Sequence, residues 1–484
     1  MNTKRILSLL LAGLMTATAF SSCGKKDDAT TDDSANTETE VTEGPKLELP
    51  TDVKGGGEDF DIFLAYNVFD GDYIVEEETG DTIKDIIYNR NETVEDYFDI
   101  NFQFRKGDTN NGTATPIIRS LIQGGDDTYE VFMNVQHYGM PLIYENLFVE
   151  WNENMKYADT TKPWWYQNVK RDINFNNKVY VMVGAYNYHP LRASGCLVFN
   201  KSLMDEIGLE YPYEYVLNGT WTVDKFIEYV KAAQADLNGD GSIDYQNDRL
   251  GFSGWKWEMM PALFLGMGGN PIQKDVFDLP ELNINTERTF TVIDKMLEVF
   301  SPGNGAWDGG NEYGVSDKMF KEGRLLFHNS TLGSLSAYRN LEDDFGAIPF
   351  PKLDETQEEY YARIVNYSSL TYIPVTNTKL DLTSAVLEYM AYISNEELIP
   401  AFYDVILTVR TARDVETEEM IPIIRNAARF MDENYLSSGT IVGILGGGQN
   451  TLASNYASYG DSWEEKLESI IEFWKGTAYE DAES

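Results

Sequence analysis

The feature that most constrains the fold is an alternation of strand and helix patterns along residues 59–135. Residues 59–66 form an apolar strand pattern, and apolar side chains then recur at helical spacing along 82–98. The rest of this alternation is a strand at 100–104, a helix that stops at Gly124 and a strand at 129–135. Strand–helix–strand units of this kind build parallel sheets with right-handed crossovers, so we predict an α/β fold.

The ends of these strands are candidate ligand positions, because open α/β sheets bind ligands beyond the carboxyl ends of their strands. Asn67 follows the first strand. The third strand leads into Asn134, Gln136, His137 and Tyr138.

A second α/β region begins near Gly195. Its first strand, 196–199, contains Cys196, which we expect to be a buried core residue rather than a nucleophile because no base stands beside it. Thr222 is expected to cap a helix. Later elements are strands at 324–328 and 345–351 and helices at 382–394, 414–434 and 463–474. Two α/β lobes joined by crossing segments are the predicted architecture.

The N-terminus is typical of an export signal. Lys4 and Arg5 precede an apolar run that is short for a membrane span, and Cys23 follows two small residues. The placement of Cys23 resembles a bacterial lipoprotein signal, in which the thiol takes a diacylglycerol and the cysteine becomes the new N-terminus. This resemblance implies a lipoprotein that carries palmitate. Ordinary signal cleavage nearby is the alternative. Residues 24–56 are polar and aperiodic, which predicts a disordered acidic tether.

Charge and composition exclude several classes of function. The 484 residues carry 38 Lys and Arg against 79 Asp and Glu, a net charge of −41, which argues against nucleic acid or an anionic membrane surface as the main partner. Three His and two Cys leave no material for a zinc finger or a disulfide framework. Any metal would therefore be bound through oxygen.

One segment has the spacing of an EF-hand-type calcium loop. Its oxygen ligands are Asp236, Asn238, Asp240, Ser242 through its carbonyl, and Asp244, with Gly241 at the sharp turn. Position 12 is Asn247 instead of an acid, and Asp248 comes one residue later. Either a bulge brings Asp248 to the metal or the site is weak, and a solvated turn that binds no metal is the alternative. Because there is no second such loop, a structural clip is favoured over a calcium sensor.

Aromatic residues stand beside amides at several predicted loops. Rings can pack on the C–H faces of a sugar while amides and carboxylates bind its hydroxyls, so a neutral, hydroxyl-rich ligand is favoured. The loops are 163–166, 186–189, 255–258, 307–308 and 328–330. Core packing is the competing interpretation, because a chain with 9 Trp and 30 Tyr must bury most of them. A Ser-His-Asp site and a phosphate-binding glycine loop have no matching motif, whereas the paired carboxylates of a glycoside hydrolase remain open.

Several segments together resemble the bacterial extracellular solute-binding proteins of family 1, the sugar-binding lipoproteins that serve ABC importers. They are the lipoprotein signal, the acidic tether and residues 86–98, 162–165, 178–183, 197–201, 236–241 and 346–351. The resemblance implies a two-lobed periplasmic-binding-protein-like fold (type II) with the ligand cleft between the lobes. It places the N-terminal lobe at 57–190 and 360–402 and the C-terminal lobe at 195–350 and 405–475.

The resemblance also implies a function. By similarity, the ligand contacts would be Tyr66, Asn67, Gln136, Tyr138, Trp255, Trp257, His328 and Asn329. We expect a carbohydrate-binding component of an ABC importer that is lipid-anchored on the extracellular face of the cell membrane. Calcium is expected as a structural ion. The expected partner is the ABC permease, and the protein itself is expected to be a monomer. We do not expect an enzyme. A surface glycoside hydrolase and a glycan-binding adhesin are the alternative functions.

Overall fold

The computed structural model describes residues 46–108, 111–365, 367–410, 416–431, 440–445 and 448–476. All of these except Lys46 belong to one compact unit, Leu47–Ser484. The predicted signal peptide with Cys23, and the first part of the predicted tether, lie outside the described residues. Within the described part, Leu47, Leu49 and Val53 already pack against a hydrophobic core, so packing begins before residue 57.

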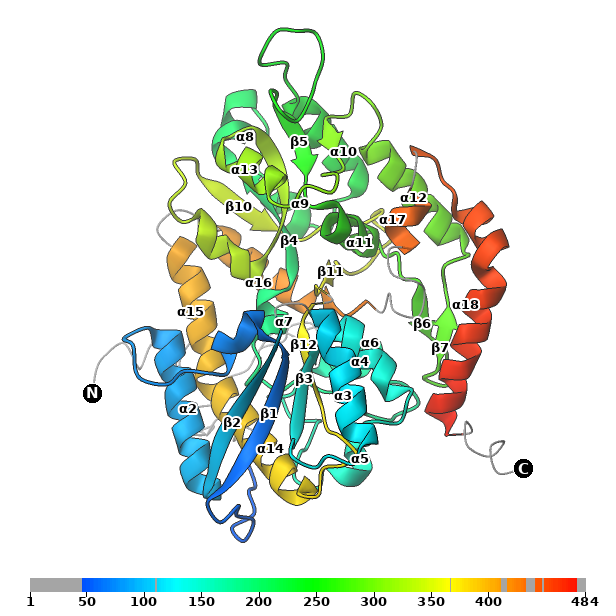
Figure 1. Ribbon diagram of the computed structural model, residues 1–484. Coiled ribbons are helices and arrows are strands. Elements are labelled where there is room, and N and C mark those ends of the chain that lie inside the picture. The colour runs from blue at the N-terminus through cyan, green and yellow to red at the C-terminus, as the bar shows by residue number, and fades with distance from the viewer. Residues whose placement is uncertain are drawn as a thin grey trace, which may run out of the picture. The chain divides into compact units, whose positions relative to one another are not determined.

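The first alternation forms the predicted parallel sheet (Figure 1). β1 (Glu58–Tyr66) lies between β2 (Ile100–Asp108) and β3 (Val131–Val135) and runs parallel to both. The crossovers are α2 (Thr82–Phe98) and α3 (Ala114–Gln123). β12 (Ser369–Tyr372) pairs antiparallel with β3 and completes a sheet of order β12-β3-β1-β2. The predicted α/β class is confirmed.

Local sequence explains the bounds of α2. The Asp81 carboxylate accepts the backbone N–H groups of Ile83 and Lys84, both at 3.1 Å, and so caps the first turn. The helix ends at Asp99, which adopts the left-handed conformation. Ile87, among others, is fully buried on the inner face.

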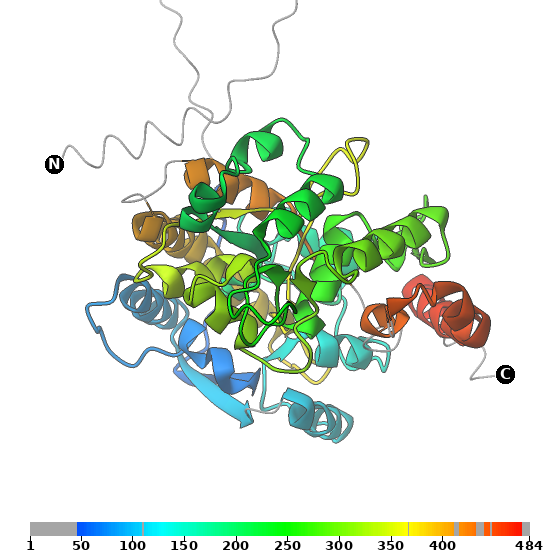
Figure 2. The same cartoon turned by 90° about the horizontal axis from the view of Figure 1, so that it is seen from above.

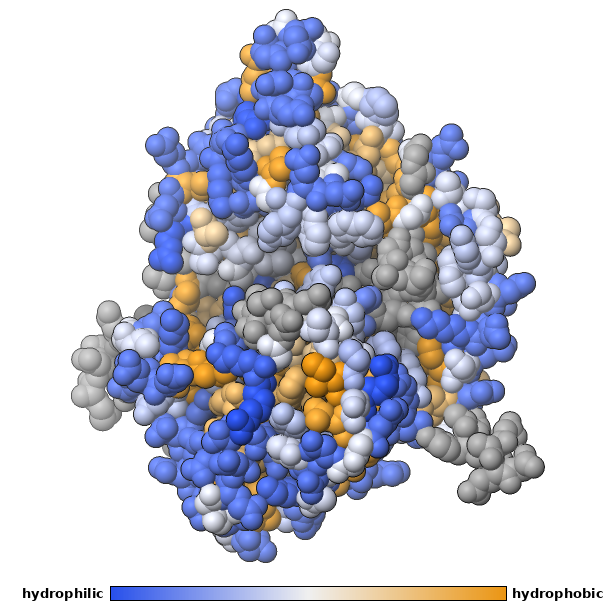
Figure 3. All heavy atoms as spheres, in the orientation of Figure 1, coloured by the Kyte–Doolittle hydropathy of each residue, from blue (hydrophilic) through white to orange (hydrophobic). Residues whose placement is uncertain are grey.

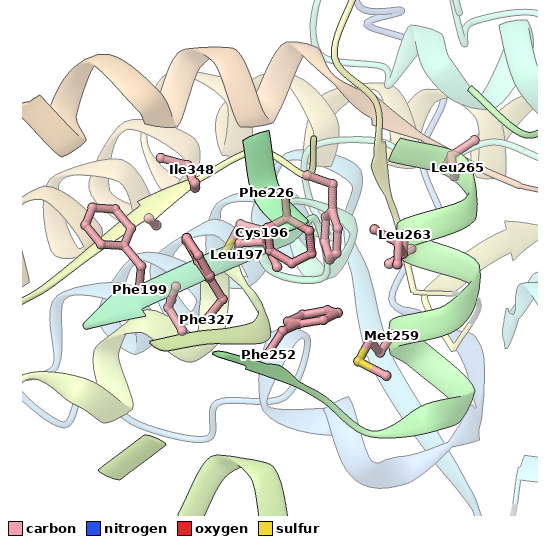
Figure 4. Close-up of a cluster of buried hydrophobic side chains, with 14 of the residues drawn as sticks. Cys196, Leu197, Phe199, Phe226, Phe252, Met259, Leu263, Leu265, Phe327 and Ile348 are labelled. Carbon is pink, nitrogen blue, oxygen red and sulfur yellow. The ribbon is translucent and has the colours of Figure 1, made fainter. Parts of the chain in front are cut away.

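The second sheet has the order β10-β4-β9-β5-β8 and mixes parallel and antiparallel pairs. Its strands are β4 (Gly195–Asn200), β5 (Leu250–Ser253), β8 (Ala306–Trp307), β9 (Leu325–Thr331) and β10 (Phe345–Ile348). Figure 4 shows its core, in which Phe199, Phe252 and Phe327 from three strands pack with Phe226 and Met259 from two helices. Cys196 lies fully buried in this core, as predicted.

Two predictions about helices are wrong in detail. The helix expected at 414–434 is α16 (Glu416–Asn426), after which β13 (Ala428–Arg429) pairs with β11 (Ala362–Arg363). Pairing with a distant strand overrides the helical pattern there. Thr222 is the N-cap of α10 (Val223–Ala233), but its side chain makes no capping hydrogen bond, and its backbone instead forms a bridge with Lys352.

Two connections between the sheets and the segment that follows α16 are hydrogen-bonded to one another. The backbone N–H of Ile364 donates to the carbonyl of Arg429 at 2.9 Å, and that of Val365 donates to the carbonyl of Ala193 at 3.2 Å. We call residues 193–195, 362–365 and 427–431 the hinge segments. Figure 1 shows β11 between the two sheets. A rotation of one sheet relative to the other would act on these segments.

The last helix, α18 (Leu452–Lys475), contributes to both cores. Its residues Leu452 and Trp463 belong to the core of the second sheet, whereas Phe473 and Trp474 belong to that of the first. A hairpin of β6 (Ile272–Lys274) and β7 (Pro280–Leu282) also reaches the core of the first sheet. Figures 1 and 2 both show α18 at one edge of the unit.

The remaining elements are short helices and turns around these sheets. They are η1 (Asn67–Asp72), η2 (Asn111–Thr113), α4 (Gln136–Ile143), α5 (Trp151–Asn154), α6 (Gln167–Ile173), α7 (His189–Arg192), α8 (Lys201–Ile207), α9 (Tyr213–Leu217), α11 (Lys256–Gly266), α12 (Glu287–Val299), α13 (Val315–Lys321), η3 (Leu332–Tyr338), α14 (Leu380–Glu396), α15 (Leu398–Arg410) and α17 (Thr440–Ile444). In the described part of the chain, no helix has the length and apolar composition needed to cross a membrane. The face shown in Figure 3 is mainly hydrophilic, with smaller apolar patches between.

Candidate functional site

The candidate ligand contacts lie where strands of both sheets end. Tyr66 is the last residue of β1, and Gln136 opens α4 directly after β3. In the second sheet, β5 ends at Ser253, and Trp255 is the N-cap of α11. Because α/β sheets bind ligands at the carboxyl ends of their strands, these positions form the candidate site.

Tyr367, in the turn before β12, is influenced electrostatically by residues at these strand ends. Burial raises the pKa of its hydroxyl, Glu258, Tyr138 and Tyr66 raise it further, and Arg363 lowers it. Residues at the end of β1, at the starts of α4 and α11 and in β11 thus all act on this hydroxyl. We call Tyr66, Tyr138, Glu258, Arg363 and Tyr367 the Tyr367 cluster.

An ion pair from two elements lies in this cluster. Nη1 of Arg363 in β11 lies 2.5 Å from Oε2 of Glu258 in the first turn of α11. The Glu258 side chain is 16% exposed, whereas that of Arg363 is only 3% exposed. The carboxylate is therefore the part of the pair that is nearer to solvent.

Two indoles stand on the same turn as Glu258. Trp257 is 44% exposed, and the half-buried Trp255 meets the exposed ring of Tyr313 edge to face, with centroids 5.4 Å apart. Gly254 lets this turn approach β9, because a Cβ there would lie 2.6 Å from Cβ of Asn329. Flat rings beside a carboxylate are suited to a sugar.

Gln136 is fully buried. Its backbone N–H donates to the Ser368 carbonyl at 3.1 Å, and its Nε2 donates to the Met431 carbonyl at 3.4 Å. Within the described residues, its Oε1 has no hydrogen-bond partner. Asn67 begins η1, and its side chain lies outside the described part of the structure.

The loop predicted after His328 is wrong, because β9 continues to Thr331. His328 is 7% exposed, stacks on Phe320 and has Nδ1 3.3 Å from the Ser253 carbonyl. Burial lowers its pKa to about 4, so the ring is neutral at pH 7. β9 is buried on both faces from Leu325 to His328, whereas the next residue, Asn329, is half-buried.

Other aromatic loops contain core residues, as the competing interpretation holds. The indole N–H groups of Trp164 and Trp165 donate to the two carboxylate oxygens of Glu388 at 2.9 and 2.8 Å, and both rings are 1% exposed. Trp307 stacks on Tyr245 with centroids 3.9 Å apart. These rings stabilise the fold.

The segment with calcium-loop spacing forms a chain of tight turns. Oδ1 and Oδ2 of Asp236 accept the N–H groups of Gly239 and Gly241 at 2.6 and 2.8 Å. Both glycines have positive φ, 77° and 83°, which side chains with a Cβ rarely adopt. Oδ1 of Asp240 accepts a hydrogen bond from the Ser242 N–H at 2.8 Å. Oδ1 of Asp244 likewise accepts one from the Gln246 N–H at 2.8 Å.

Asp248 holds the two ends of this loop together. Its side chain is fully buried, and its carboxylate accepts the N–H groups of Asp244 at 2.8 Å and Leu237 at 2.9 Å. The bond from Asp244 is the main reason why the pKa of Asp248 is lowered. Carboxylate, amide and carbonyl oxygens are the chemistry that calcium needs. In the described residues, however, no three Asp, Glu, His or Cys side chains gather closely enough to hold a metal ion. The loop thus has suitable donors that do not converge, and the calcium site stays a prediction.

Two α/β sheets joined by adjacent hinge segments, with aromatic and charged residues at their strand ends, define a two-lobed α/β fold. No protein-family model and no curated protein matches the sequence. Solved structures do match, and three of them are described next.

An ABC substrate-binding protein from Listeria monocytogenes in complex with cycloalternan has a TM-score of 0.54 and 12% identity, covering 87% of this chain and 99% of its own. The maltodextrin-binding domain from Bdellovibrio bacteriovorus bound to maltotriose has a TM-score of 0.52 and 16% identity, covering 85% and 99%. UgpB from Mycobacterium tuberculosis in complex with glycerophosphocholine has a TM-score of 0.55 and 14% identity, covering 85% and 98%. These likenesses confirm the predicted two-lobed fold.

Three members of the Tyr367 cluster were not among the predicted site residues. Glu258 lies in the segment 255–258, which was chosen for its two tryptophans. The glutamate itself belongs to no sequence motif that would mark it as a ligand contact. Arg363 and Tyr367 lie in a crossing segment more than a hundred residues further on. Only the topology brings them to the strand ends of both sheets.

Proposed function

We propose that the protein is the carbohydrate-binding component of an ABC importer, which binds an oligosaccharide outside the cell and delivers it to the permease. The observation that carries this proposal is the ion pair of Glu258 with Arg363, which places a carboxylate of the second lobe against a hinge segment and beside two indoles. The half-buried indole of Trp255 and the exposed indole of Trp257, on the same turn as Glu258, add aromatic faces to this position.

The chemistry of these groups suits a sugar. Tyrosine and tryptophan rings offer apolar faces to the C–H groups of a pyranose, and their polar atoms with Glu258 can bind hydroxyls. Two of the similar structures hold oligosaccharides, cycloalternan and maltotriose, which supports a ligand of several sugar units.

The mechanism that this arrangement supports is closure around the ligand. Tyr66 and Tyr138 belong to the first lobe, and Trp255 and Glu258 belong to the second. An oligosaccharide that contacts both sets stabilises the conformation in which they are closest, and the hinge segments take up the rotation. The permease would recognise the closed form.

A thermal-shift panel tests the proposal. The full chain, purified in detergent, is heated with each of a set of oligosaccharides at a hundred times the dissociation constant. Binding should raise the free energy of unfolding by about 2.7 kcal/mol. The absence of a shift with any glycan would refute the proposal.

The same samples separate the alternative functions. A retaining or inverting glycosidase needs two carboxyl groups at the scissile bond, whereas the Tyr367 cluster holds one carboxylate, which is paired with Arg363. Appearance of new reducing ends over many turnovers would favour a hydrolase. An adhesin would bind a surface glycan but give no response to short oligosaccharides.

We further propose a calcium ion as a clip for the loop 236–248. Asp236, Asn238, Asp240 and Asp244 would supply side-chain oxygens and Ser242 its carbonyl, after a rearrangement of the carboxylates. Asp248 already accepts two backbone N–H groups of the loop. It would either keep these hydrogen bonds and stabilise the loop without touching the ion, or become the last ligand of the site.

We also propose that Cys23 carries a lipid that anchors the protein, as a monomer, on the extracellular face of the cell membrane. The support is the sequence of the export signal and the polar segment after it. More than one acyl chain is needed for lasting attachment, since each buried methylene contributes about 0.8 kcal/mol.

A further inference from the structure

The geometry points to Glu258 as the principal hydroxyl acceptor of the ligand site, and to Arg363 as the residue that positions its carboxylate against the hinge segments. The class of ligand that follows is a neutral, hydroxyl-rich glycan rather than an acidic one. This inference rests on the proposed function and names the ligand class of the same site.

The relative exposure of the pair determines which charge the ligand meets. Glu258 is 16% exposed and Arg363 is 3% exposed, so a ligand reaches the carboxylate before the guanidinium. An ionised carboxylate only accepts hydrogen bonds and has about four lone-pair sites. It therefore favours hydroxyl donors and repels a uronate or phosphate group.

Tyrosine hydroxyls, which can both donate and accept hydrogen bonds, belong to the Tyr367 cluster together with the pair. In the Tyr367 cluster, Glu258, Tyr138 and Tyr66 all raise the pKa of the Tyr367 hydroxyl, and Arg363 is the one group that lowers it. The positive charge of Arg363 is held by Glu258 at 2.5 Å. An acidic sugar would thus have to compete for a guanidinium that is already paired and buried.

Arg363 ties this carboxylate to the hinge. It lies in β11, which pairs in parallel with β13 at Arg363 and Arg429. Its neighbour Ile364 donates to the Arg429 carbonyl at 2.9 Å and forms a bridge with Ser194. The Glu258 side chain is therefore fixed, through Arg363, to one hinge segment, and that segment is hydrogen-bonded to the other two. A ligand that bonds to Glu258 consequently acts on the hinge segments.

The test is calorimetric titration of the full chain in detergent with four trisaccharides. Maltotriose, cellotriose and mannotriose are neutral, and trigalacturonate is acidic. The variant Glu258→Gln keeps the shape of the side chain and removes its charge. The matched control Glu206→Gln removes the charge of an exposed glutamate, which pairs with Arg249 at 2.8 Å at the surface of the second lobe.

We expect the wild-type chain to bind at least one neutral trisaccharide and to bind trigalacturonate at least tenfold more weakly. Glu258→Gln should lower the affinity for the neutral trisaccharide tenfold or more, and it should reduce the ratio between the affinities for the neutral trisaccharide and for trigalacturonate. Glu206→Gln should change neither that affinity nor that ratio. Equal affinities for wild type and Glu258→Gln, or tighter binding of trigalacturonate by the wild type, would overturn this inference and leave the proposed function intact. A wild-type chain that binds none of the four would overturn the proposed function and this inference with it.

A double-mutant cycle tests the positioning role of Arg363. Arg363→Met should weaken neutral binding in the wild-type background and have little effect in the Glu258→Gln background. If Arg363 only supported the fold, Arg363→Met would weaken binding by the same factor in both backgrounds. Should Arg363→Met not fold, Arg363→Lys, which keeps the charge and loses the planar fork, is expected to give the same non-additivity.

Discussion

Glu388 offers a prediction whose size follows from the structure. Its carboxylate is 3% exposed and accepts three hydrogen bonds, from the indoles of Trp164 and Trp165 and, at 3.1 Å, from the backbone N–H of Asp159. Burial nevertheless raises its pKa from 4.5 to about 7, and the nearby Asp159 carboxylate adds to the rise. The folded protein therefore holds a proton on Glu388 over a pH range in which the unfolded chain does not.

The sign of the pH dependence follows from this difference. A group whose pKa is higher in the folded state stabilises the fold fully below pH 4.5, and this contribution disappears as the pH rises through about 7. At 1.36 kcal/mol for each unit between the two pKa values, the contribution is about 3 kcal/mol. Glu388→Gln, which resembles the protonated carboxyl, lacks this dependence.

Chemical unfolding of wild type and Glu388→Gln at pH values from about 4.5 to 8 measures the effect. The free energy of unfolding of the variant minus that of the wild type should rise by about 3 kcal/mol across the range. The comparison cancels the contributions of other titrating groups, such as Asp72, whose pKa is raised to about 6 by burial. A difference that does not change with pH would refute the reasoning, because it would mean that Glu388 stays in one protonation state.

Three further predictions concern the ligand, the metal and the anchor. Trp255→Ala should weaken oligosaccharide binding about tenfold, whereas Tyr459→Ala, which removes an exposed ring on α18, should leave it unchanged. If calorimetry gives the same affinity for Trp255→Ala and the wild type, Trp255 is not part of the site. Adding calcium should raise the melting temperature of the wild type, and chelation or Asp240→Asn should abolish the increase; a melting temperature indifferent to calcium would exclude the clip. Cys23→Ala should move the protein from the membrane fraction to the medium, and unchanged fractionation would contradict lipid anchoring.

Elements with strong local signals could be predicted from the sequence. β1 and α2 have their predicted positions because each has a consistent apolar period and because Asp81 caps the helix. α16 was predicted too long because its end is fixed by the pairing of β13 with β11, whose residues lie far away in the chain. Periodicity contains no information about such a partner.

The candidate site could be predicted only in part, for a related reason. Gln136 and Tyr138 follow directly from the rule that ligands bind at strand ends, whereas Tyr66 and Trp255 were expected from the family resemblance. Glu258, Arg363 and Tyr367 meet only after the chain crosses between the sheets. His328 and Trp164 were singled out by composition but lie in cores, where the partner Glu388 of Trp164 is 224 residues away.

Calorimetric titration of the full chain with neutral oligosaccharides, combined with an assay for new reducing ends, tests the central claim most directly. The account predicts saturable binding of one oligosaccharide per chain and no new reducing ends after prolonged incubation. Binding of no oligosaccharide, or turnover of the one that binds, would contradict it.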